Sequence, residues 1–385
     1  MAGDRKRERK SWQMKIGVTC YPTVGGSGVI ATELGMLLAE NGHEVHFITS
    51  SIPFRLDAFH AGVFYHQVEM NHYPVFQYPP YDLALASKMA EVIDEEKLDI
   101  LHVHYAIPHA VCAILARDMA EHDVKVVTTL HGTDISVLGI DDTFKKMIKY
   151  GIEHSDAVTS VSKSLKKQTE QIVGTTYPIE VIYNFVNEKE YYPFEAPDLK
   201  EHCGIQQEEK VLIHISNFRK VKRVPDIIRT FHLIQKEMPC KLLLVGDGPE
   251  YSTAKTLVSQ LRLEDRVLFL GKQNNISDLI AISDLMLLMS EKESFGLVLL
   301  EAMACGIPGI GTNIGGIPEV LSHGETGFVV EKGNVEKAAE YALKLLQDTD
   351  LYEKFSKQAI ERVSEKFHSL KIVKQYTDLY ERLLY

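Results

Sequence analysis

Residues 15–40, KIGVTCYPTVGGSGVIATELGMLLAE, contain the pattern that decides the fold. The β-branched and apolar residues up to Tyr21 predict a strand, and the apolar residues after the glycines recur at helical spacing. Between them, Gly25, Gly26 and Gly28 form a turn that brings backbone N–H groups and a helix N-terminus to one edge of the sheet. A strand, a glycine-rich turn and a helix in this order predict an open α/β sheet with parallel strands.

The same alternation of strand and helix patterns continues along the chain and then starts a second time. We expect strands at residues 15–21, 44–50, 63–69, 99–105, 125–131, 157–162 and 180–185, and then at 210–216, 240–248, 266–271, 285–290, 308–313 and 327–330. The polar, proline-bearing residues 186–204 separate the two series, which is typical of a connection between domains. The sequence therefore predicts two Rossmann-like, doubly wound domains, at residues 14–186 and 187–365. They are expected to face a central cleft at the carboxyl ends of their strands.

The two ends of the chain fall outside this pattern. Residues 1–13, MAGDRKRERKSWQ, are basic and polar, which is typical of a disordered tail, with a nucleic-acid or membrane tether as the alternative. Residues 366–385 show the apolar spacing of a helix and need a surface to cover. We expect this last helix to pack back across the N-terminal domain.

Composition narrows the functional classes. The 385 residues are 45% hydrophobic and 25% charged, as in an ordinary globular protein, and the net charge of -11 argues against a nucleic-acid partner. No apolar run predicts a membrane span or a signal peptide, so we expect a cytoplasmic protein without a membrane partner. The five cysteines are scattered and odd in number, which predicts reduced thiols rather than disulfides or a zinc cluster.

The glycine-rich turn also allows a different interpretation. Residues 26–31 match the G-x-G-x-x-A fingerprint of dinucleotide-binding proteins. That fingerprint needs an acidic residue at the end of the second strand, where this sequence has Thr49, Ser50 and Ser51. A nicotinamide or flavin is therefore disfavoured, and we expect no cofactor. Tight packing of the helix on the strand is a further explanation of the glycines.

Histidines mark the ends of two further strands. His131 follows an apolar strand, close to Thr129 and Asp134, where an imidazole can hydrogen-bond a sugar hydroxyl. His102 and His104 form an H-x-H pair that resembles a metal site, but no carboxylate or cysteine stands at a suitable spacing. We therefore expect core or site histidines and no metal.

The first strand of the second series runs into SNFRKVKR, residues 216–223. Arg219, Lys220, Lys222 and Arg223 form a basic cluster in an otherwise acidic protein. Such a cluster suits a diphosphate, whose negative charge must be stabilised as it leaves a sugar. A solvated basic surface is the alternative.

Two glutamates are separated by seven residues in SEKESFGLVLLEAMACGIP, residues 290–308. Residues 294–297 are expected to form the first turn of a helix, whose N-terminus favours phosphate. At a rise of ~1.5 Å per residue, Glu293 and Glu301 lie about 12 Å apart along the axis, so they cannot act as acid and base on one atom. We expect Glu301 to bind a ribose and Glu293 a sugar ring, with two solvated glutamates as the alternative.

Taken together, these motifs resemble family 4 of the retaining GT-B glycosyltransferases. The resemblance rests on SNFRKVKR, on GDGPE (246–250), on ESFGLVLLEAMACG (293–306) and on GTNIGGIPEVL (311–321), in this order and at matching strand ends. It extends from about Met14 to the end of the chain. It implies a nucleotide-sugar donor held by the C-terminal domain, an acceptor held by the N-terminal domain, and no metal.

The resemblance also assigns roles by position. Lys222 and Arg219 neutralise the diphosphate, Glu301 binds the ribose, Glu293 holds the donor sugar, and His131 contacts the 6-hydroxyl of that sugar. Further donor contacts are expected at Gly26, Ser27, Asn217, Phe295, Gly296 and Leu297. The chain departs from the family at residues 216–218, Ser-Asn-Phe, where Gly-Arg-Leu is usual before the lysine. Because that arginine is missing, Arg219 is expected to replace it.

The first half looks very similar to the branch of the family that acts in bacillithiol biosynthesis. The similar segments are residues 16–35, 46–56, 78–92 and 128–139. This resemblance implies UDP-N-acetylglucosamine as donor, the hydroxyl of L-malate as acceptor, and a homodimer or higher homo-oligomer. A dicarboxylate needs positive or hydrogen-bonding groups, and the candidates on loops of the N-terminal domain are Ser27, Arg55, Tyr105 and Thr129.

The expected mechanism retains the anomeric configuration without a covalent nucleophile. The acceptor hydroxyl attacks from the face that UDP leaves, and the donor phosphate takes its proton. The alternatives are a family 4 enzyme with another sugar or a lipid acceptor, a UDP-sugar epimerase or hydrolase, and a catalytically silent sugar-nucleotide sensor. The presence of Arg219, Lys222, Glu293 and Glu301 argues against the sensor, which need not stabilise a leaving diphosphate.

Overall fold

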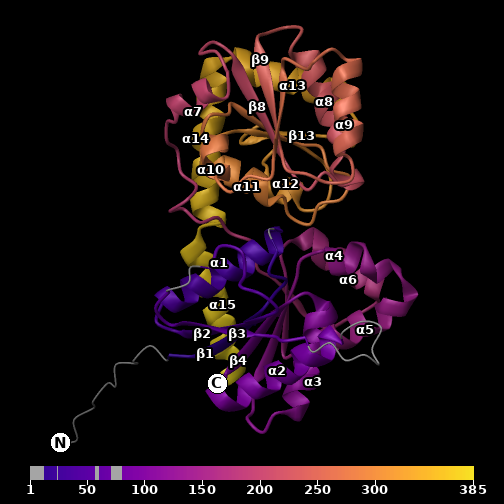
Figure 1. Ribbon diagram of the computed structural model, residues 1–385, viewed down its shortest axis with the longest axis vertical. Coiled ribbons are helices and arrows are strands. Elements are labelled where there is room, and N and C mark those ends of the chain that lie inside the picture. The colour runs from indigo at the N-terminus through magenta and orange to yellow at the C-terminus, as the bar shows by residue number, and fades with distance from the viewer. Residues whose placement is uncertain (1–12, 24, 57–59, 71–79) are drawn as a thin grey trace, which may run out of the picture. The chain divides into compact units, whose positions relative to one another are not determined.

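The computed structural model describes residues 13–23, 25–56, 60–70 and 80–385, and these form two compact units (Figure 1). Unit 1 contains the described residues up to Ser160, together with Gln168–Glu180 and Val373–Tyr385. Unit 2 contains Val161–Lys167 and Val181–Ile372. The tail expected over residues 1–13 lies outside the described residues except for Gln13, which is exposed.

Unit 1 is built on a seven-stranded sheet of order β3-β2-β1-β4-β5-β6-β7. Its elements are β1 (Lys15–Thr19), α1 (Gly26–Glu40), β2 (Glu44–Thr49), β3 (Val63–Gln67), α2 (Tyr81–Glu96), β4 (Ile100–His104), the π-helical turn η1 (Ala106–Ala110), α3 (Val111–Met119), β5 (Lys125–Leu130), α4 (Thr133–Ser136), η2 (Leu138–Ile140), α5 (Asp142–Glu153), β6 (Ala157–Ser160), α6 (Lys163–Val173, shared with unit 2) and β7 (Ile179–Val181). The pairings from β3 through β6 are parallel. The order runs outward from β1 in both directions, which is the doubly wound arrangement.

Unit 2 repeats this plan with a six-stranded sheet of order β10-β9-β8-β11-β12-β13. Its elements are α7 (Pro197–His202), β8 (Lys210–Ile215), η3 (Lys220–Lys222), α8 (Val224–Ile234), β9 (Cys240–Val245), α9 (Tyr251–Gln260), β10 (Val267–Gly271), α10 (Ile276–Ala281), β11 (Leu285–Leu288), α11 (Leu297–Ala304), β12 (Gly309–Thr312), α12 (Ile317–Val320), β13 (Gly327–Val330), α13 (Val335–Gln347) and α14 (Thr349–Lys366). Its strands are parallel as well. The prediction of two Rossmann-like α/β domains is confirmed.

The central strands are almost fully buried because helices cover both faces of each sheet. Leu212, Leu242, Leu244, Leu285 and Leu287 belong to one buried cluster of unit 2. Every strand segment predicted from the sequence overlaps a strand, and several strands end before the predicted residue. At these points the chain leaves the sheet, and the candidate site residues follow.

The chain passes into unit 2 between Glu180 and Val181, slightly before the expected boundary after residue 186. The reason is that residues 181–186 pack within unit 2. Tyr183 donates a hydrogen bond to Glu319 across 3.1 Å, and Val186 forms a bridge with His368. The connection itself therefore contributes side chains to the second core.

The last helix, α15 (Ser369–Leu384), belongs to both units. Its first residue, Ser369, donates its backbone N–H to Glu188 in unit 2. From Val373 onward the helix lies in unit 1, where the Tyr380 hydroxyl is 2.7 Å from Nδ1 of His102. The apolar stripe that the sequence shows in residues 366–385 thus covers the sheet of unit 1.

Helix α1 is buried over most of its length rather than along one face only. Two glycines allow this close packing. A Cβ at Gly28 would lie 2.7 Å from the carbonyl oxygen of Tyr21, and a Cβ at Gly35 would lie 2.4 Å from the ring of Phe47. For Gly28, tight packing is therefore a sufficient reason for the residue type.

The five cysteines are free thiols, and all except Cys203 are buried.

Candidate functional site

In unit 2, a basic loop follows the first strand. After β8 the chain passes through residues 216–219 into the short helix η3, and Arg223 precedes α8 in the left-handed conformation at φ 51°. Phe218 anchors the loop because its ring is completely buried. The basic side chains are thus fixed at the carboxyl end of a strand, where doubly wound folds bind ligands.

The four basic side chains of this loop differ in their partners. Arg223 is held by Asp226 at 2.6 Å and by Glu291 at 3.3 Å, so it stabilises the loop. Arg219 and Lys220 are exposed, and no described residue forms an ion pair with either. The predicted basic cluster therefore contains one side chain held by carboxylates and two that are open to solvent.

Lys222 and Glu293 form the central ion pair of this half of the site. The Lys222 ammonium donates to Oε2 of Glu293 across 2.6 Å, and the two side chains are 21% and 15% exposed. Ser290 donates to the same carboxylate oxygen across 3.4 Å. Two residues predicted separately from the sequence are thus brought into direct contact, partly shielded from water.

Two glycines hold the loop that carries Glu293. A Cβ at Gly315 would lie 1.7 Å from the carbonyl oxygen of Glu293, and a Cβ at Gly316 would lie 2.3 Å from that of Ser294. Gly315 also has a φ of +57°, which glycine tolerates without strain. The Gly316 N–H donates to the Glu293 carbonyl at 3.1 Å. Reasoning from the sequence recognised the GTNIGGIPEVL motif but missed its function as a support for the Glu293 loop.

Helix α11 begins later than predicted. The first turn expected at residues 294–297 is wrong, because Ser294, Phe295 and Gly296 precede the helix, which starts at Leu297. Gly296 is the N-cap in the left-handed conformation at φ 97° and redirects the chain into the helix. Phe295 is buried rather than open to a ligand, so its predicted contact can come only from its backbone.

Glu301 lies inside α11 and is only 7% exposed. It is therefore not a solvated surface glutamate, which was the alternative drawn from the sequence. A carboxylate at this level of burial requires polar partners.

A second pair of glycines supports the basic loop. Cβ atoms at Gly246 and Gly248 would lie 1.8 Å and 2.1 Å from the carbonyl oxygens of Ser216 and Asn217. The GDGPE turn therefore packs directly on the backbone of residues 216–217. The side chain of Asn217 remains exposed beside Arg219.

In unit 1, the candidate residues are centred on His131. Its Nε2 lies 2.8 Å from Nδ1 of His104, which is completely buried. Burial lowers the pKa of His131 to about 3, with a smaller contribution from His109. The His131 ring is therefore neutral near pH 7 and can donate or accept a hydrogen bond without carrying charge.

His102 and His104, the H-x-H pair, are completely buried. Nε2 of His102 is 2.7 Å from the Thr129 hydroxyl, and its Nδ1 faces Tyr380. Desolvation lowers the pKa of His102 to about 3 and that of His104 well below its usual value. The interpretation as core histidines is consistent with these contacts.

The prediction that Thr129 contacts the acceptor is wrong. Its side chain is completely buried, and its hydroxyl lies 2.7 Å from both His102 Nε2 and the Thr159 hydroxyl. The Tyr376 hydroxyl is a third neighbour, at 3.4 Å. A hydroxyl that is enclosed and already bonded cannot reach a ligand, so Thr129 stabilises the core instead.

Ser27 and Tyr105 are brought together, as residues of one site should be. Their hydroxyl oxygens are 2.6 Å apart, and Ser27 lies in the first turn of α1 next to the exposed Gly26. Burial raises the pKa of Tyr105 to about 12, so its phenol stays protonated. These two hydroxyl groups form a neutral hydrogen-bonding pair at the N-terminus of α1.

Arg55 lies on the loop after β2 in the left-handed conformation at φ 69°. Its guanidinium is 3.5 Å from the carboxylate of Glu33, and its side chain is 16% exposed. It is the cation among the residues predicted for the acceptor. The contact with Glu33 means that an anionic ligand would have to compete with that carboxylate.

No helix of the described segments has the length and apolar character needed to cross a membrane.

The comparisons with known proteins cover both units. The family model described as Glycosyltransferase Family 4 matches residues 24–190, and that described as Glycosyl transferases group 1 matches residues 196–362. Among solved structures, a glycosyltransferase of Rickettsia africae has a TM-score of 0.80 at 24% identity, covering 97% of this chain and 99% of that one. The Anabaena protein HepE, in complex with UDP and glucose, has a TM-score of 0.80 at 22% identity, covering 96% and 100%. These structures establish the fold.

Sequence relatives are more specific. The chain is 58% identical, over 97% of its length and 98% of the relative, to the N-acetyl-alpha-D-glucosaminyl L-malate synthase of Bacillus anthracis. It is 28% identical, over 96% of its length and 98% of the relative, to an uncharacterized glycosyltransferase of Methanocaldococcus jannaschii. Near full-length similarity at this level, two matching family models and two Rossmann-like units with the GT-B fold lead to one conclusion: the chain belongs to glycosyltransferase family 4.

Proposed function

We propose that the protein transfers N-acetylglucosamine from UDP-N-acetylglucosamine to the hydroxyl of L-malate, the first step of bacillithiol biosynthesis. The observation that carries this proposal is the 58% identity over 97% of the chain with the Bacillus anthracis protein whose name states that product. The segments that resemble the bacillithiol branch lie in the half that is expected to bind the acceptor, where substrate choice is made.

The donor half of the proposed site is in unit 2. Loss of UDP from the sugar leaves negative charge on the diphosphate, and cations that are already in place lower the energy of that state. Lys222 is held by Glu293 at 2.6 Å, whereas Arg219 is exposed and can close on the phosphates. With these two side chains and the first N–H groups of α11, the protein itself supplies the positive charge, so we propose transfer without a metal or another cofactor.

The remaining donor contacts follow from the resemblance. Glu301 would hold the ribose, and Glu293 would accept hydrogen bonds from the sugar while it orients Lys222. Asn217 and the backbone at residues 295–297 would complete the donor contacts within unit 2.

The acceptor half of the proposed site is in unit 1. His131, neutral because burial lowers its pKa to about 3, suits a sugar hydroxyl and would not attract the malate carboxylates. Ser27 and Tyr105 offer hydroxyls 2.6 Å apart, and Arg55 offers a positive charge. Thr129 has no part in this proposal because its hydroxyl is enclosed.

We propose that the reaction retains the anomeric configuration. The malate oxygen forms the new bond to the anomeric carbon on the face from which the phosphate oxygen departs. The malate hydroxyl proton passes to that departing oxygen, so no protein carboxylate has to serve as nucleophile. Lys222 and Arg219 stabilise the charge that remains on UDP.

The test is UDP release from UDP-N-acetylglucosamine, with and without L-malate and with and without EDTA, followed by mass and anomeric analysis of the product. Malate-dependent release that EDTA does not change, with an α-linked product, is the expected result. A β-linked product would refute the retaining mechanism, and loss of activity in EDTA would refute metal independence.

Other outcomes point to the alternatives. UDP release without any acceptor would favour an epimerase or hydrolase. If malate gives no UDP release but a sugar or lipid acceptor does, the enzyme belongs to another branch of the family.

A further inference from the structure

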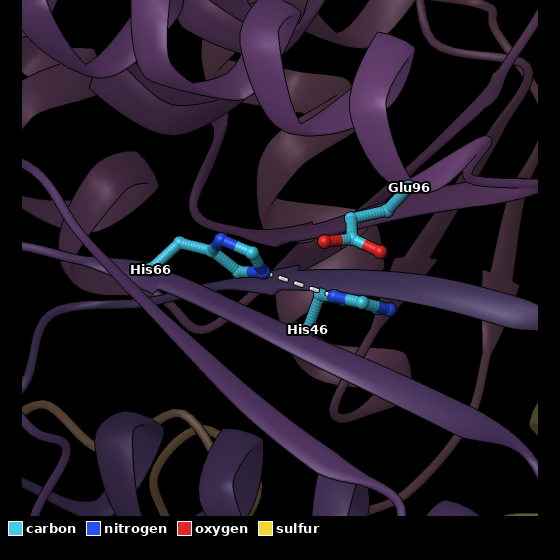
Figure 2. Close-up of side chains that lie close together, drawn as sticks. All are labelled: His46, His66 and Glu96. Atoms are coloured by element: carbon cyan, nitrogen blue, oxygen red, sulfur yellow. Dashed lines mark hydrogen bonds between the residues drawn. The ribbon is translucent and has the colours of Figure 1, made fainter.

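A group of metal-ligating side chains lies in unit 1, away from the residues discussed above. His46 is on β2, His66 is on β3, and Glu96 is the last residue of α2. One potential ligand atom from each residue lies within 4.8 Å of those of the other two. Figure 2 shows the Glu96 carboxylate turned toward the two imidazole rings, which approach each other edge to edge at His46 Nδ1 and His66 Nε2, 2.9 Å apart.

The sheet register explains this meeting. In the parallel pair β2–β3, His66 is opposite Ile48, two residues after His46. Because alternate residues of a strand face the same side, both imidazoles project from one face of the sheet. Helix α2 ends beside that face, so three residues far apart in sequence converge. No spacing rule for metal motifs would have found them, which is why the sequence analysis missed this group.

The hydrogen bonds of His46 leave one nitrogen suited to a metal. Its Nε2 lies 3.0 Å from Oε1 of Glu44, and an ionised carboxylate can only accept, so Nε2 carries the proton. A neutral imidazole then has its lone pair on Nδ1, the atom that faces His66. Glu44 is itself held by Lys15 at 2.7 Å. A carboxylate that fixes the tautomer of a histidine is the usual outer partner of a metal-binding imidazole.

We propose that His46, His66 and Glu96 bind a divalent transition-metal ion of the Zn²⁺ type, through Nδ1, Nε2 and a carboxylate oxygen. Two imidazole nitrogens and one carboxylate oxygen are ligands that zinc accepts, with water in the fourth position. Magnesium and calcium prefer oxygen ligands and would bind weakly here.

Binding requires the two nitrogens to move slightly apart and the Glu96 carboxylate to move closer, because the three ligand atoms now lie within 4.8 Å of one another. Two ligands at bond lengths of about 2.0–2.1 Å from a tetrahedral ion lie about 3.3 Å apart, compared with the present 2.9 Å between the two nitrogens. His46 is buried, whereas His66 and Glu96 are partly exposed, so an ion can enter and these two side chains can adjust. The proton on Nε2 of His66, which points at Nδ1 of His46, moves to Nδ1 of the His66 ring as that neutral imidazole changes tautomer, so both ligand nitrogens present a lone pair to the ion.

The place of this group in the fold indicates a structural rather than a chemical role. Glu96 precedes β4 and therefore lies at the amino edge of the sheet, whereas Arg55, Tyr105 and His131 follow the carboxyl ends of their strands. An ion here would tie the edge strand β3 to β2 and to the end of α2. The inference does not depend on the proposed function, because sugar transfer uses other residues.

The first experiment measures Zn²⁺ binding to the full chain without an affinity tag, after removal of metal with a chelator. Calorimetric titration should give one ion per chain, and Co²⁺ should produce the visible absorption of a tetrahedral site. The melting temperature should rise with added Zn²⁺, because a ligand that binds only the folded state stabilises it. A chain that binds neither ion would overturn the proposal.

Variants assign the ion to these residues. His66→Gln should abolish stoichiometric binding, and Glu96→Gln should weaken it at least tenfold. Glu44→Gln should weaken it by about 10–100-fold, because the outer partner is lost while the ligands remain. The matched control is His154→Gln, an exposed histidine of unit 1 outside the group, which should bind like the unchanged protein. Unchanged binding by His66→Gln would show that the ion sits elsewhere and refute the site.

Discussion

The candidate residues on the loops after β8 and β11 of unit 2 are charged and partly exposed, whereas those around His131 in unit 1 are neutral and largely buried. Lys222 and Glu293 form a partly exposed ion pair, and Arg219 beside them is exposed. In unit 1, His131 is 8% exposed and keeps its neutral form because burial lowers its pKa to about 3. The difference matches the two tasks of the proposed function, in which one half would stabilise a leaving diphosphate and the other would recognise hydroxyl groups without attracting that anion.

The charged half should be the more sensitive to substitution. Lys222→Ala is expected to lower kcat by about 100–1000-fold, the usual loss when one group that stabilises transition-state charge is removed. The KM for the donor should change much less, because the interaction strengthens as UDP departs. UDP release under saturating malate measures both constants.

Lys220→Ala is the matched control for that experiment. Lys220 is a neighbour in the same short helix, is exposed and forms no ion pair with a described residue, so its removal should change kcat less than twofold. Equal losses in the two variants would mean that the general charge of the loop matters and that Lys222 has no special position.

The loop that carries Glu293 should depend on the glycines behind it. Gly315→Ala would place a methyl group 1.7 Å from the Glu293 carbonyl oxygen, and the resulting shift should cost about 3 kcal/mol of folding free energy, in the upper range for overpacking. Donor binding should weaken as well. Urea unfolding and the donor KM are the measurements.

Gly324→Ala separates steric contact from backbone strain. Gly324 also has a positive φ, +80°, but a Cβ there would meet nothing within 4 Å. Its substitution should therefore cost only the strain of a left-handed residue, about 1–2 kcal/mol. If both variants lose the same stability, the close approach to Glu293 is not what requires glycine at 315.

The pattern of strands and helices was predictable because parallel strands covered on both faces are mostly apolar runs of characteristic length, and every predicted strand segment overlaps a strand. The positions of Lys222, Glu293 and His131 at strand ends followed from the same pattern. The contacts between particular side chains could not be predicted. The ion pair of Lys222 with Glu293 joins loops after β8 and β11, which are neighbours in the sheet but far apart in sequence.

For Thr129, the sequence suggested a ligand contact that the structure does not allow. A threonine at the end of a strand looks available, yet its exposure depends on the last helix of the chain, which brings Tyr376 against it. Burial that is imposed by a distant segment has no local signal in the sequence.

The neutral half should be the more sensitive to acid. The pKa of His102 and of His131 is lowered to about 3, so each stabilises the folded state fully above its unfolded value of about 6.5 and loses that contribution as the pH falls. At pH 5 the loss is about 2 kcal/mol for one such histidine. Unit 1 also contains His104 and His109 with lowered pKa values, whereas in unit 2 such a shift is large only at His214 among the described histidines.

Pulse proteolysis in urea at pH 7.5 and pH 5, with the fragments assigned by mass spectrometry, measures the two units separately. Unit 1 should lose more stability than unit 2. His131→Asn should reduce the difference between the two pH values by about 2 kcal/mol, whereas His154→Asn, at an exposed histidine, should leave it unchanged. Equal losses in both units would contradict the contrast between them.

The smallest expected effect concerns the hydroxyl pair of unit 1. Ser27→Ala and Tyr105→Phe each remove one partner of the 2.6 Å contact and should each lower kcat/KM for malate by about fivefold, corresponding to about 1 kcal/mol for a neutral hydrogen bond. Because the two hydroxyls act together, the double variant should lose little more than either single variant. Tyr21→Phe is the control, since its ring lies 5.5 Å from that of Tyr105 but its hydroxyl has no hydrogen-bond partner among the described residues. Additive losses would mean that the two hydroxyls contact the substrates independently. Unit 1 would then recognise its ligand through separate groups rather than through one preformed pair of hydroxyls.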